Sequence, residues 1–249
     1  MTVPPPEPGP VRRTAVLTGA SRGLGRVVAG LLAGEGYDLI VVAREPGPLA
    51  ELAQHARRFG GEVVEVVGDV SDRRTRNEVR ARTGRWGGLD LLVNNASELG
   101  PSPLPPLLQL SMDSLDRVFR VNVAAPLALV QELAPALARR RGLVVNVSSD
   151  AARGGYPGWG AYGASKAALD LVSLTLAHEL EAAGIAVVAV DPGDMRTAMH
   201  QAAYPGQDIS DRPLPDVTLP FWAWLLGRPH AGVTGQRYLA QSDHWGAGQ

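Results

Sequence analysis

The chain of 249 residues contains no cysteine, a single lysine, few aromatic residues and almost no net charge. Without cysteine it can form neither disulfides nor thiolate metal sites. A formal net charge of -1 also lacks the basic surplus that a dedicated nucleic-acid-binding protein normally carries. No apolar run reaches the roughly 18 residues of a membrane-spanning helix, and the proline-rich start is unlike a signal peptide. We therefore expect a cytoplasmic protein that binds neither nucleic acid nor a membrane.

The one lysine is Lys166, whereas the other 23 basic residues are arginines. Codon bias is the simplest explanation of the excess of arginine over lysine, because glycine and proline are abundant too. Lysine, however, carries a compact ammonium on a slender stem, whereas arginine carries a wide planar guanidinium. Position 166 is therefore a candidate functional site. The five histidines show no spacing typical of metal ligands, and we expect no metal.

The pattern of apolar residues predicts the organisation of the chain. Residues 1–12 are proline-rich without periodicity, so we expect a disordered leader. Residues 13–245 alternate short apolar runs with helical patterns, as in one α/β domain. The expected strands are 15–17, 39–42, 63–67, 89–93, 143–147, 185–190 and 237–240. Most of these runs are continuous rather than alternating, and the seventh is weaker. Together they predict an α/β fold with a single Rossmann-like, doubly wound, parallel seven-stranded sheet and helices on both faces.

Helices are expected between these strands. The predicted ranges are 27–32, 49–59, 75–86, 112–141 and 162–183. Pro126 and Pro135 predict a kink or bulge in the fourth of them. The long connections 99–110 and 197–218 follow the fourth and sixth strands, so both should overhang the edge of the sheet where ligands bind.

A glycine-rich turn joins the first strand to the first helix. Its glycines permit a tight turn and a close approach of the backbone to a pyrophosphate. The helix that follows offers free N–H groups and the positive end of its dipole to the anion. In this context we expect a dinucleotide site rather than a structural turn alone. The predicted contacts are Gly19, Ser21, Arg22, Gly23, Leu24 and Gly25.

The end of the second strand indicates which dinucleotide binds. An acidic residue there would bond the ribose 2′-hydroxyl of NAD, but Arg44 occupies the position. Arg22 offers a second guanidinium, and two guanidiniums suit a 2′-phosphate. The alternative is that Arg44 is merely solvated and that Glu45 binds the ribose. We expect NADP(H) rather than NAD(H).

Tyr162 and Lys166 are four residues apart, on one face of the last long helix. An unperturbed tyrosine has a pKa of about 10, too high for easy proton exchange at neutral pH. A nearby cation favours the phenolate, so we expect Lys166 to lower the pKa of Tyr162. Ser149 follows the fifth strand at the same edge of the sheet. Alone, the tyrosine–lysine pair would be better explained by an amphipathic surface helix.

Together these motifs resemble the short-chain dehydrogenase/reductase family from residue 14 to 240. The matching positions, in order, are Thr18–Gly25, Asp69, Val70, Asn94, Asn95, Ala96, Asn122, Ser149, Tyr162, Lys166, Pro192, Gly193 and Thr197. The chain departs from the family at Ser97, where glycine is usual, and at Asp191 and Asp194, in a segment that is often less acidic. The resemblance implies that residues 13–245 form a dinucleotide-binding catalytic domain, which transfers hydride between NADP(H) and a small carbonyl or secondary alcohol.

The resemblance also implies a role for each matched residue. Tyr162 would be the general acid that protonates the carbonyl oxygen, or the base in the reverse direction, and Ser149 would hydrogen-bond that oxygen. Lys166 would bond the nicotinamide ribose. Asn122 would hold open a kinked helix and a water that leads protons to Lys166. The remaining cofactor contacts are Asp69 and Val70 at the adenine, Asn95 and Ala96 beneath the adenosine ribose, and Pro192, Gly193, Met195 and Thr197 at the nicotinamide.

Several alternatives stay open. Within enzymes, the chain could be a 3-oxoacyl-thioester (acyl carrier protein) reductase, although no basic docking patch is obvious. It could also be a non-catalytic NADP(H)-binding regulator, against which the complete set of catalytic residues argues. Tyr156 and Trp159 are candidates for lining the substrate pocket, whereas Trp222 and Trp224 fit core or subunit packing better. The family resemblance further implies a homo-oligomer, a tetramer or a dimer.

Overall fold

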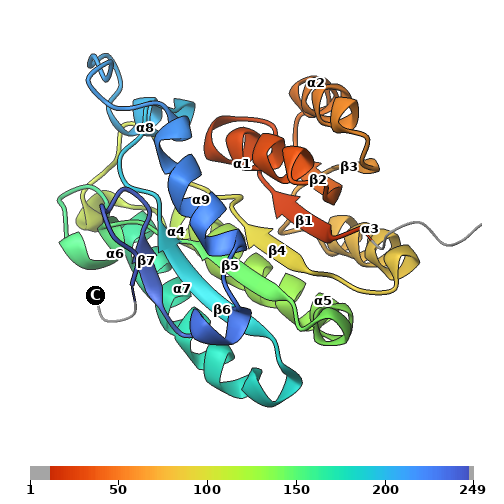
Figure 1. Ribbon diagram of the computed structural model, residues 1–249. Helices are drawn as coiled ribbons and strands as arrows, with labels where there is room; N and C mark the ends of the chain where they lie inside the picture. Colours follow the sequence, from red (N-terminus) through yellow and green to blue (C-terminus); the bar gives the residue numbers. More distant parts are fainter. Residues whose placement is uncertain (1–11, 247–249) are drawn as a thin grey trace, which may run out of the picture.

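The computed structural model describes residues 12–246, so the predicted leader lies outside the described residues except for its last position. Seven parallel strands form one sheet in the order β3-β2-β1-β4-β5-β6-β7 (Figure 1). They are β1 (Thr14–Thr18), β2 (Asp38–Ala43), β3 (Val63–Val67), β4 (Leu91–Asn94), β5 (Leu143–Val147), β6 (Ala186–Asp191) and β7 (Arg237–Leu239). Each coincides with a predicted strand, with ends shifted by at most two residues. The predicted doubly wound, Rossmann-like sheet is confirmed.

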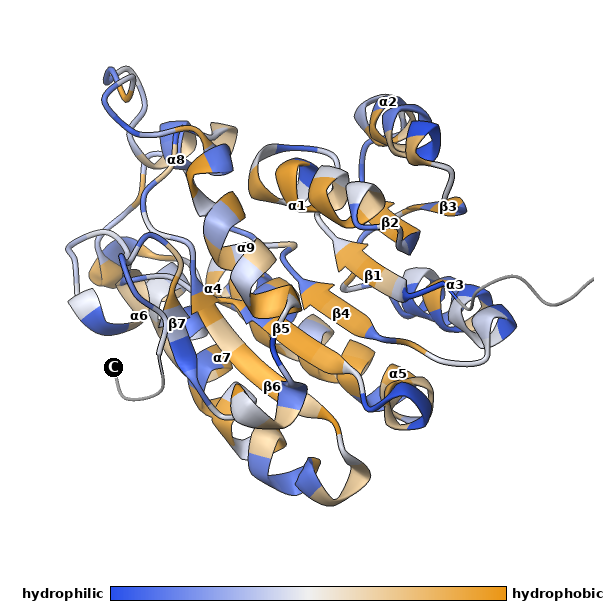
Figure 2. Ribbon diagram, in the orientation of Figure 1, coloured by the Kyte–Doolittle hydropathy of each residue, from blue (hydrophilic) through white to orange (hydrophobic). Residues whose placement is uncertain are grey.

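Helices cover both faces of the sheet (Figure 1). One face carries α1 (Gly23–Gly34), α2 (Pro46–Ala56) and α9 (Leu219–Leu226), and the other carries α3 (Arg73–Thr83), α5 (Ala125–Arg140) and α7 (Gly160–Glu179). Alternate residues of β1 supply the two apolar layers, because successive side chains of a strand point to opposite faces. Figure 2 shows the strands as an apolar band between helices with polar outer surfaces.

The long predicted helix is interrupted close to Pro126. It consists of α4 (Met112–Phe119), a π-helical turn (η4, Arg120–Ala124) and α5. Pro126 has no N–H to donate to a carbonyl one turn earlier, so the regular bonding pattern cannot continue through it. The predicted bulge is therefore confirmed beside Pro126, whereas Pro135 lies within regular α5. This stretch is long and apolar enough to cross a membrane, but half of its most apolar part is buried inside the molecule, as in a core helix.

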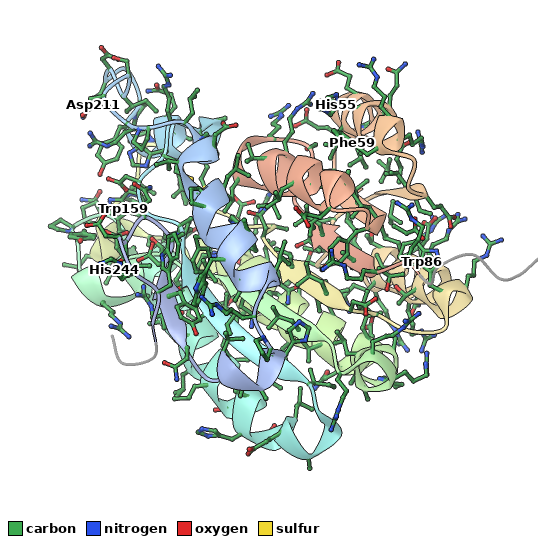
Figure 3. The ribbon with its side chains drawn as sticks, in the orientation of Figure 1. His55, Phe59, Trp86, Trp159, Asp211 and His244 are labelled. Carbon is green, nitrogen blue, oxygen red and sulfur yellow. The ribbon has the colours of Figure 1, made fainter. Side chains whose placement is uncertain are left out.

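Short helices occupy several connections that the sequence did not predict to be helical. They are η3 (Leu107–Gln109), α6 (Ala151–Gly154), α8 (Ala198–Ala203), η6 (Pro215–Thr218) and η7 (His230–Gly232). Three further short helices lie within predicted helices and extend α2, α3 and α7: η1 (Arg57–Phe59), η2 (Gly84–Trp86) and η5 (Glu181–Ala183). α8 and the loop after it stand over one end of the sheet (Figure 1), and Asp211 marks the tip of that loop in Figure 3. α9 brings the fully buried Trp222 into the core, so core packing is confirmed for this residue.

Candidate active site

A cleft of 480 Å³ runs along the carboxyl ends of the strands, from the glycine-rich turn to Tyr162. It collects residues from every predicted motif. The predicted residues that line it are Gly19, Ser21, Arg22, Gly23, Leu24, Arg44, Asp69, Val70, Asn95, Ala96, Ser149, Tyr162, Lys166, Pro192, Gly193, Met195 and Thr197. Gly25 and Asn122, also predicted, lie behind its wall and support it through contacts described below. Sites far apart in the sequence therefore meet at one edge of the sheet, as expected for a doubly wound fold.

The glycine-rich turn depends on two glycines and one asparagine. Gly19 has a φ of +65°, and a Cβ on Gly25 would lie 2.1 Å from the carbonyl oxygen of Gly19. A side chain at either position would therefore disrupt the turn. Asn95 Nδ2 donates to the carbonyl oxygens of Thr18 and Gly19, both at 3.0 Å. Asn95 thus holds the turn against the end of β4, and the N-terminus of α1 faces the cleft.

Both arginines of the predicted 2′-phosphate site pair with carboxylates of the cleft wall. Arg22 forms an ion pair with Glu45. The Nη1 atom of Arg44 lies 3.5 Å from Oε2 of Glu98, which is also 3.2 Å from Nη2 of Arg117. The Arg22 and Arg44 side chains are more than half exposed, so both guanidiniums can turn toward an anion in the cleft. Glu98 was not predicted to belong to the site, although it stands two residues after the Asn94-Asn95-Ala96 motif.

Tyr162 and Lys166 lie together on α7 and face the same cleft, as predicted. The Nζ atom of Lys166 is 5.5 Å from the ring centroid of Tyr162 and donates to the carbonyl oxygen of Val147 at 2.8 Å. Both side chains are buried. Ser149, after β5, lines the same cleft, and its Oγ donates to Asp150 Oδ1 at 3.0 Å.

The titration behaviour of the pair differs from the prediction. Burial raises the pKa of Tyr162 to about 12, and hydrogen bonds with Ser97 and Ser149 act in the opposite direction. Burial also lowers the pKa of Lys166 to about 8, against the attraction of the Asp170 carboxylate. The predicted direction is therefore wrong: the pKa of Tyr162 is raised, because desolvation outweighs the groups that favour the phenolate, and the Lys166 ammonium is directed at the Val147 carbonyl.

Asn122 is fully buried in the π-helical turn and connects three parts of the site. Its Oδ1 accepts from the backbone N–H of Glu98 at 2.7 Å and from Ser97 Oγ at 3.2 Å. Its Nδ2 donates to the carbonyl oxygen of Glu98 and to Ser165 Oγ, both at 2.9 Å. Ser165 belongs to α7, one turn beyond Tyr162. The Asn122 side chain therefore fixes the loop after β4 against α7, which carries Tyr162 and Lys166.

An apolar wall lies beside Tyr162. Trp159 lines the cleft and stacks edge-on against Tyr162, with 5.7 Å between ring centroids. Leu99, Met199 and Ala202 extend this wall, and Figure 3 shows Trp159 on the side of the molecule that carries α6. Of the two aromatic residues predicted to line the pocket, Trp159 is confirmed. Tyr156 is 46% exposed and packs on Gly154 outside the cleft, so that prediction is wrong.

Comparisons with known proteins agree with this arrangement. A sequence model of the family described as short chain dehydrogenase matches residues 13–208. The uncharacterised oxidoreductase YciK of Escherichia coli K12 is 31% identical over 235 residues, which cover 92% of both proteins. A short chain dehydrogenase of Shigella flexneri, solved in complex with NADP, superposes with a TM-score of 0.86 at 30% identity, over 92% of this chain and 97% of that chain.

A second solved structure has the same fold. This short chain dehydrogenase of Escherichia coli CFT073, in complex with NADPH, gives a TM-score of 0.83 at 31% identity, over 92% of this chain and 97% of that chain. The family match includes the glycine-rich turn, Ser149, Tyr162 and Lys166, all of which line one cleft here. The chain therefore belongs to the short-chain dehydrogenase/reductase family and is an oxidoreductase.

Proposed function

We propose that the protein is an NADP(H)-dependent oxidoreductase that interconverts a small apolar ketone or aldehyde with its alcohol, through Ser149, Tyr162, Lys166 and Asn122. The observation that carries the proposal is the shared cleft: one continuous cavity joins the glycine-rich turn to the hydroxyl groups of Ser149 and Tyr162. A cofactor held at one end would thus present its reactive ring at the other, where two hydroxyl groups are available to a substrate oxygen.

The cleft fits NADP(H) by its shape and its charge. The close approach of Gly25 to Gly19 leaves backbone N–H groups and the N-terminus of α1 for a pyrophosphate. Arg22 and Arg44 would bind the 2′-phosphate in exchange for their carboxylate partners. The remaining contacts would be Asp69 and Val70 at the adenine, Asn95 and Ala96 at the adenosine ribose, Lys166 at the nicotinamide ribose, and Pro192, Gly193, Met195 and Thr197 at the nicotinamide. When bound, the cofactor supplies the hydride.

The protein's own residues supply the proton and the orientation. Ser149 Oγ donates a hydrogen bond to the substrate carbonyl oxygen, and the Tyr162 hydroxyl donates the proton that this oxygen acquires. Since the pKa of Tyr162 is raised to about 12, Tyr162 is protonated at neutral pH and is ready to act as the acid. Lys166 and Asn122 would lead a replacement proton to Tyr162 after it has protonated the substrate. Trp159, which packs against Tyr162, would exclude water from the reacting oxygen.

The charge around the cleft supports a neutral substrate. Asp150 and Asp194 line the cleft, and the Asp194 side chain is more than half exposed. Such a surface repels an anionic acyl carrier, which weighs against the 3-oxoacyl-thioester reductase. The apolar wall at Trp159 and Leu99 supports an uncharged, apolar carbonyl compound.

The test is turnover of NADPH with a panel of ketones and aldehydes of graded size. We expect wild-type activity with at least one apolar carbonyl, and a fall in kcat of about 1,000-fold for Tyr162→Phe, which loses only the transferred proton. The dissociation constant of NADPH should stay unchanged, since the phenyl ring keeps its packing. A Tyr162→Phe variant as active as the wild type would contradict the proposal, and a protein that binds NADPH but turns over no carbonyl would favour the regulator.

Cofactor preference has a separate test at Arg44. Arg44→Ala should raise the KM for NADPH by about 10-fold or more, because charge-assisted hydrogen bonds to the 2′-phosphate are lost. The KM for NADH should hardly change. Glu98→Gln should act in the opposite direction, since it releases Arg44 from its carboxylate partner. Equal kcat/KM for the two cofactors, unaffected by Arg44→Ala, would contradict this assignment.

The proposal includes a cytoplasmic homo-oligomer, a dimer or a tetramer. Leu171 and Leu174 on α7 support it, because their side chains are 66% and 42% exposed and exposed apolar surface of this kind is typical of interfaces. Light scattering coupled to size-exclusion chromatography tests the assembly, and a monomer at micromolar concentration would contradict it.

A further inference from the structure

Arg237, at the start of β7, extends its guanidinium into the structure behind the cleft. Its side chain is 13% exposed, and it bonds three acceptors from three segments. Nε donates to Asp170 Oδ2 at 2.9 Å, and Nη2 donates to Asp191 Oδ2 at 3.1 Å and to the backbone carbonyl oxygen of Ser149 at 2.9 Å. Arg237 does not line the cleft.

Each acceptor belongs to a segment that carries a functional group. Ser149 itself supplies the hydroxyl that would bind the substrate oxygen. Asp170 lies on α7, four residues beyond Lys166 and therefore on the same side of the helix. Asp191 ends β6, and its Oδ1 accepts from the backbone N–H of Gly193 at 3.0 Å, so it holds the turn proposed to contact the nicotinamide.

The charges make this network dependent on Arg237. The side chains of Asp170 and Asp191 are only 18% and 5% exposed. Among residues 12–246, no other basic side chain forms an ion pair with either carboxylate. A planar guanidinium can bond several acceptors in fixed directions, which an ammonium cannot do. Because a buried ion pair contributes little net stability by itself, geometric control of the site explains this arrangement better than stability does.

We propose that Arg237 is a positioning residue, which holds Ser149, the Asp191–Gly193 turn and the Lys166 face of α7 in the arrangement needed for turnover. The proposal rests on the proposed function. Arg237 would affect the rate through the positions of these groups, because a displacement of about 1 Å at a reacting group can lower the rate about 100-fold.

The main test is Arg237→Lys, which keeps the positive charge and loses the planar fork. We expect kcat to fall about 10- to 100-fold, while the dissociation constant of NADPH and the KM of the carbonyl change less than about threefold. The primary isotope effect on kcat with C4-deuterated NADPH should rise, because hydride transfer then limits turnover. Arg228→Lys is the matched control, since the Arg228 guanidinium lies over the Trp224 ring and away from these acceptors, and its kcat should equal the wild-type value.

Asp170→Asn is the second variant, and it decides the question should Arg237→Lys fail to fold. It removes one of the three anchors and should lower kcat with the same small change in KM. A purely structural role would lower Tm in both variants and leave kcat of the folded protein unchanged, which would overturn the inference. A wild-type protein that turns over no carbonyl with NADPH defeats the proposed function and this inference together, whereas an active wild type with fully active variants defeats this inference alone.

Discussion

Ser97 stands in the candidate site at a position where the family resemblance predicts glycine. Its Oγ donates to Asn122 Oδ1 at 3.2 Å, and its hydrogen bond with Tyr162 lowers the pKa of Tyr162. The hydroxyl therefore joins the buried asparagine to the proposed proton donor, at a position where a glycine would leave Tyr162 with Ser149 alone. In a site where burial raises the pKa of Tyr162 to about 12, such a hydrogen bond makes proton release easier.

Replacing Ser97 with glycine should therefore move the pH dependence of the reaction. When Tyr162 loses its proton, the Ser97 hydroxyl can turn from Asn122 and donate to the phenolate. Loss of this donor raises the pKa of Tyr162, so kcat for alcohol oxidation should reach half its maximum at a higher pH. A hydrogen bond contributes about 1 kcal/mol, which corresponds to a displacement of about half a pH unit or more. Thr175→Ala removes an exposed hydroxyl from α7 as a control and should leave the profile in place. A Ser97→Gly profile that coincides with the wild type would contradict this role.

At the scale of elements, the strands were predictable and several helices were not. Most strands are continuous apolar runs that are buried on both faces, so composition alone marks them, whereas β3 and β7 at the two edges of the sheet are partly exposed. α6 and α8 are too short to show a helical period, and α9 is nearly all apolar, so that no polar face marks it as a helix. The π-helical turn was foreseen as a bulge from Pro126, but its position could not be, because it depends on the tertiary bonds of Asn122.

The candidate site was predictable to a similar degree. Residues in family motifs, such as Tyr162 and Asn95, meet in the cleft as predicted. Arg237 could not be foreseen, because its partners Ser149, Asp170 and Asp191 are brought to it only by the pairing of β6 with β7. The pKa of Tyr162 was predicted in the wrong direction, since burial depends on the packing of Trp159 and its neighbours, which no local motif records.

The π-helical turn at residues 120–124 can be tested for its effect on the position of Asn122. Pro126→Ala restores an N–H that can bond one turn back and allows a regular helix through residues 120–124. A regular helix would rotate Asn122 away from Glu98 and Ser165, so we expect kcat to fall about 10-fold, with Tm unchanged or raised.

Pro135→Ala is the matched control for this change. It also restores an N–H, but within regular α5 and away from the cleft, so kcat should equal the wild-type value. Steady-state kinetics and thermal unfolding measure both effects. Equal kcat for Pro126→Ala and the wild type would show that the π-helical turn is not needed for catalysis.

For the whole molecule, placing its only lysine inside the fold has a cost that depends on pH. Lys166 is 2% exposed, and burial lowers its pKa from 10.5 to about 8. Below about pH 8 the lysine is protonated in both the folded and the unfolded chain, so the full cost of burying the charge is present. Between pH 8 and 10.5 the unfolded chain binds more protons than the folded one, and the free energy of unfolding should therefore rise with pH over this interval.

Lys166→Met should remove this dependence. At about pH 7 the buried charge costs about 3 kcal/mol, and loss of the hydrogen bond to the Val147 carbonyl offsets about 1 kcal/mol of the gain. The variant should therefore be more stable than the wild type by about 2 kcal/mol, and the difference should shrink as the pH approaches about 9.5. Urea unfolding at several pH values measures this difference in the free energy of unfolding. The pH should stay below about 9.5, because above that value the raised pKa of Tyr162 makes the free energy of unfolding fall with pH. Arg58→Met, which removes an exposed cation from η1, is the control and should keep the wild-type slope. A Lys166→Met protein that is less stable than the wild type at pH 7, with an unchanged dependence of the free energy of unfolding on pH, would show that burial of the ammonium costs no stability. The expected result would show that the fold gives up stability to keep this cation beside Tyr162.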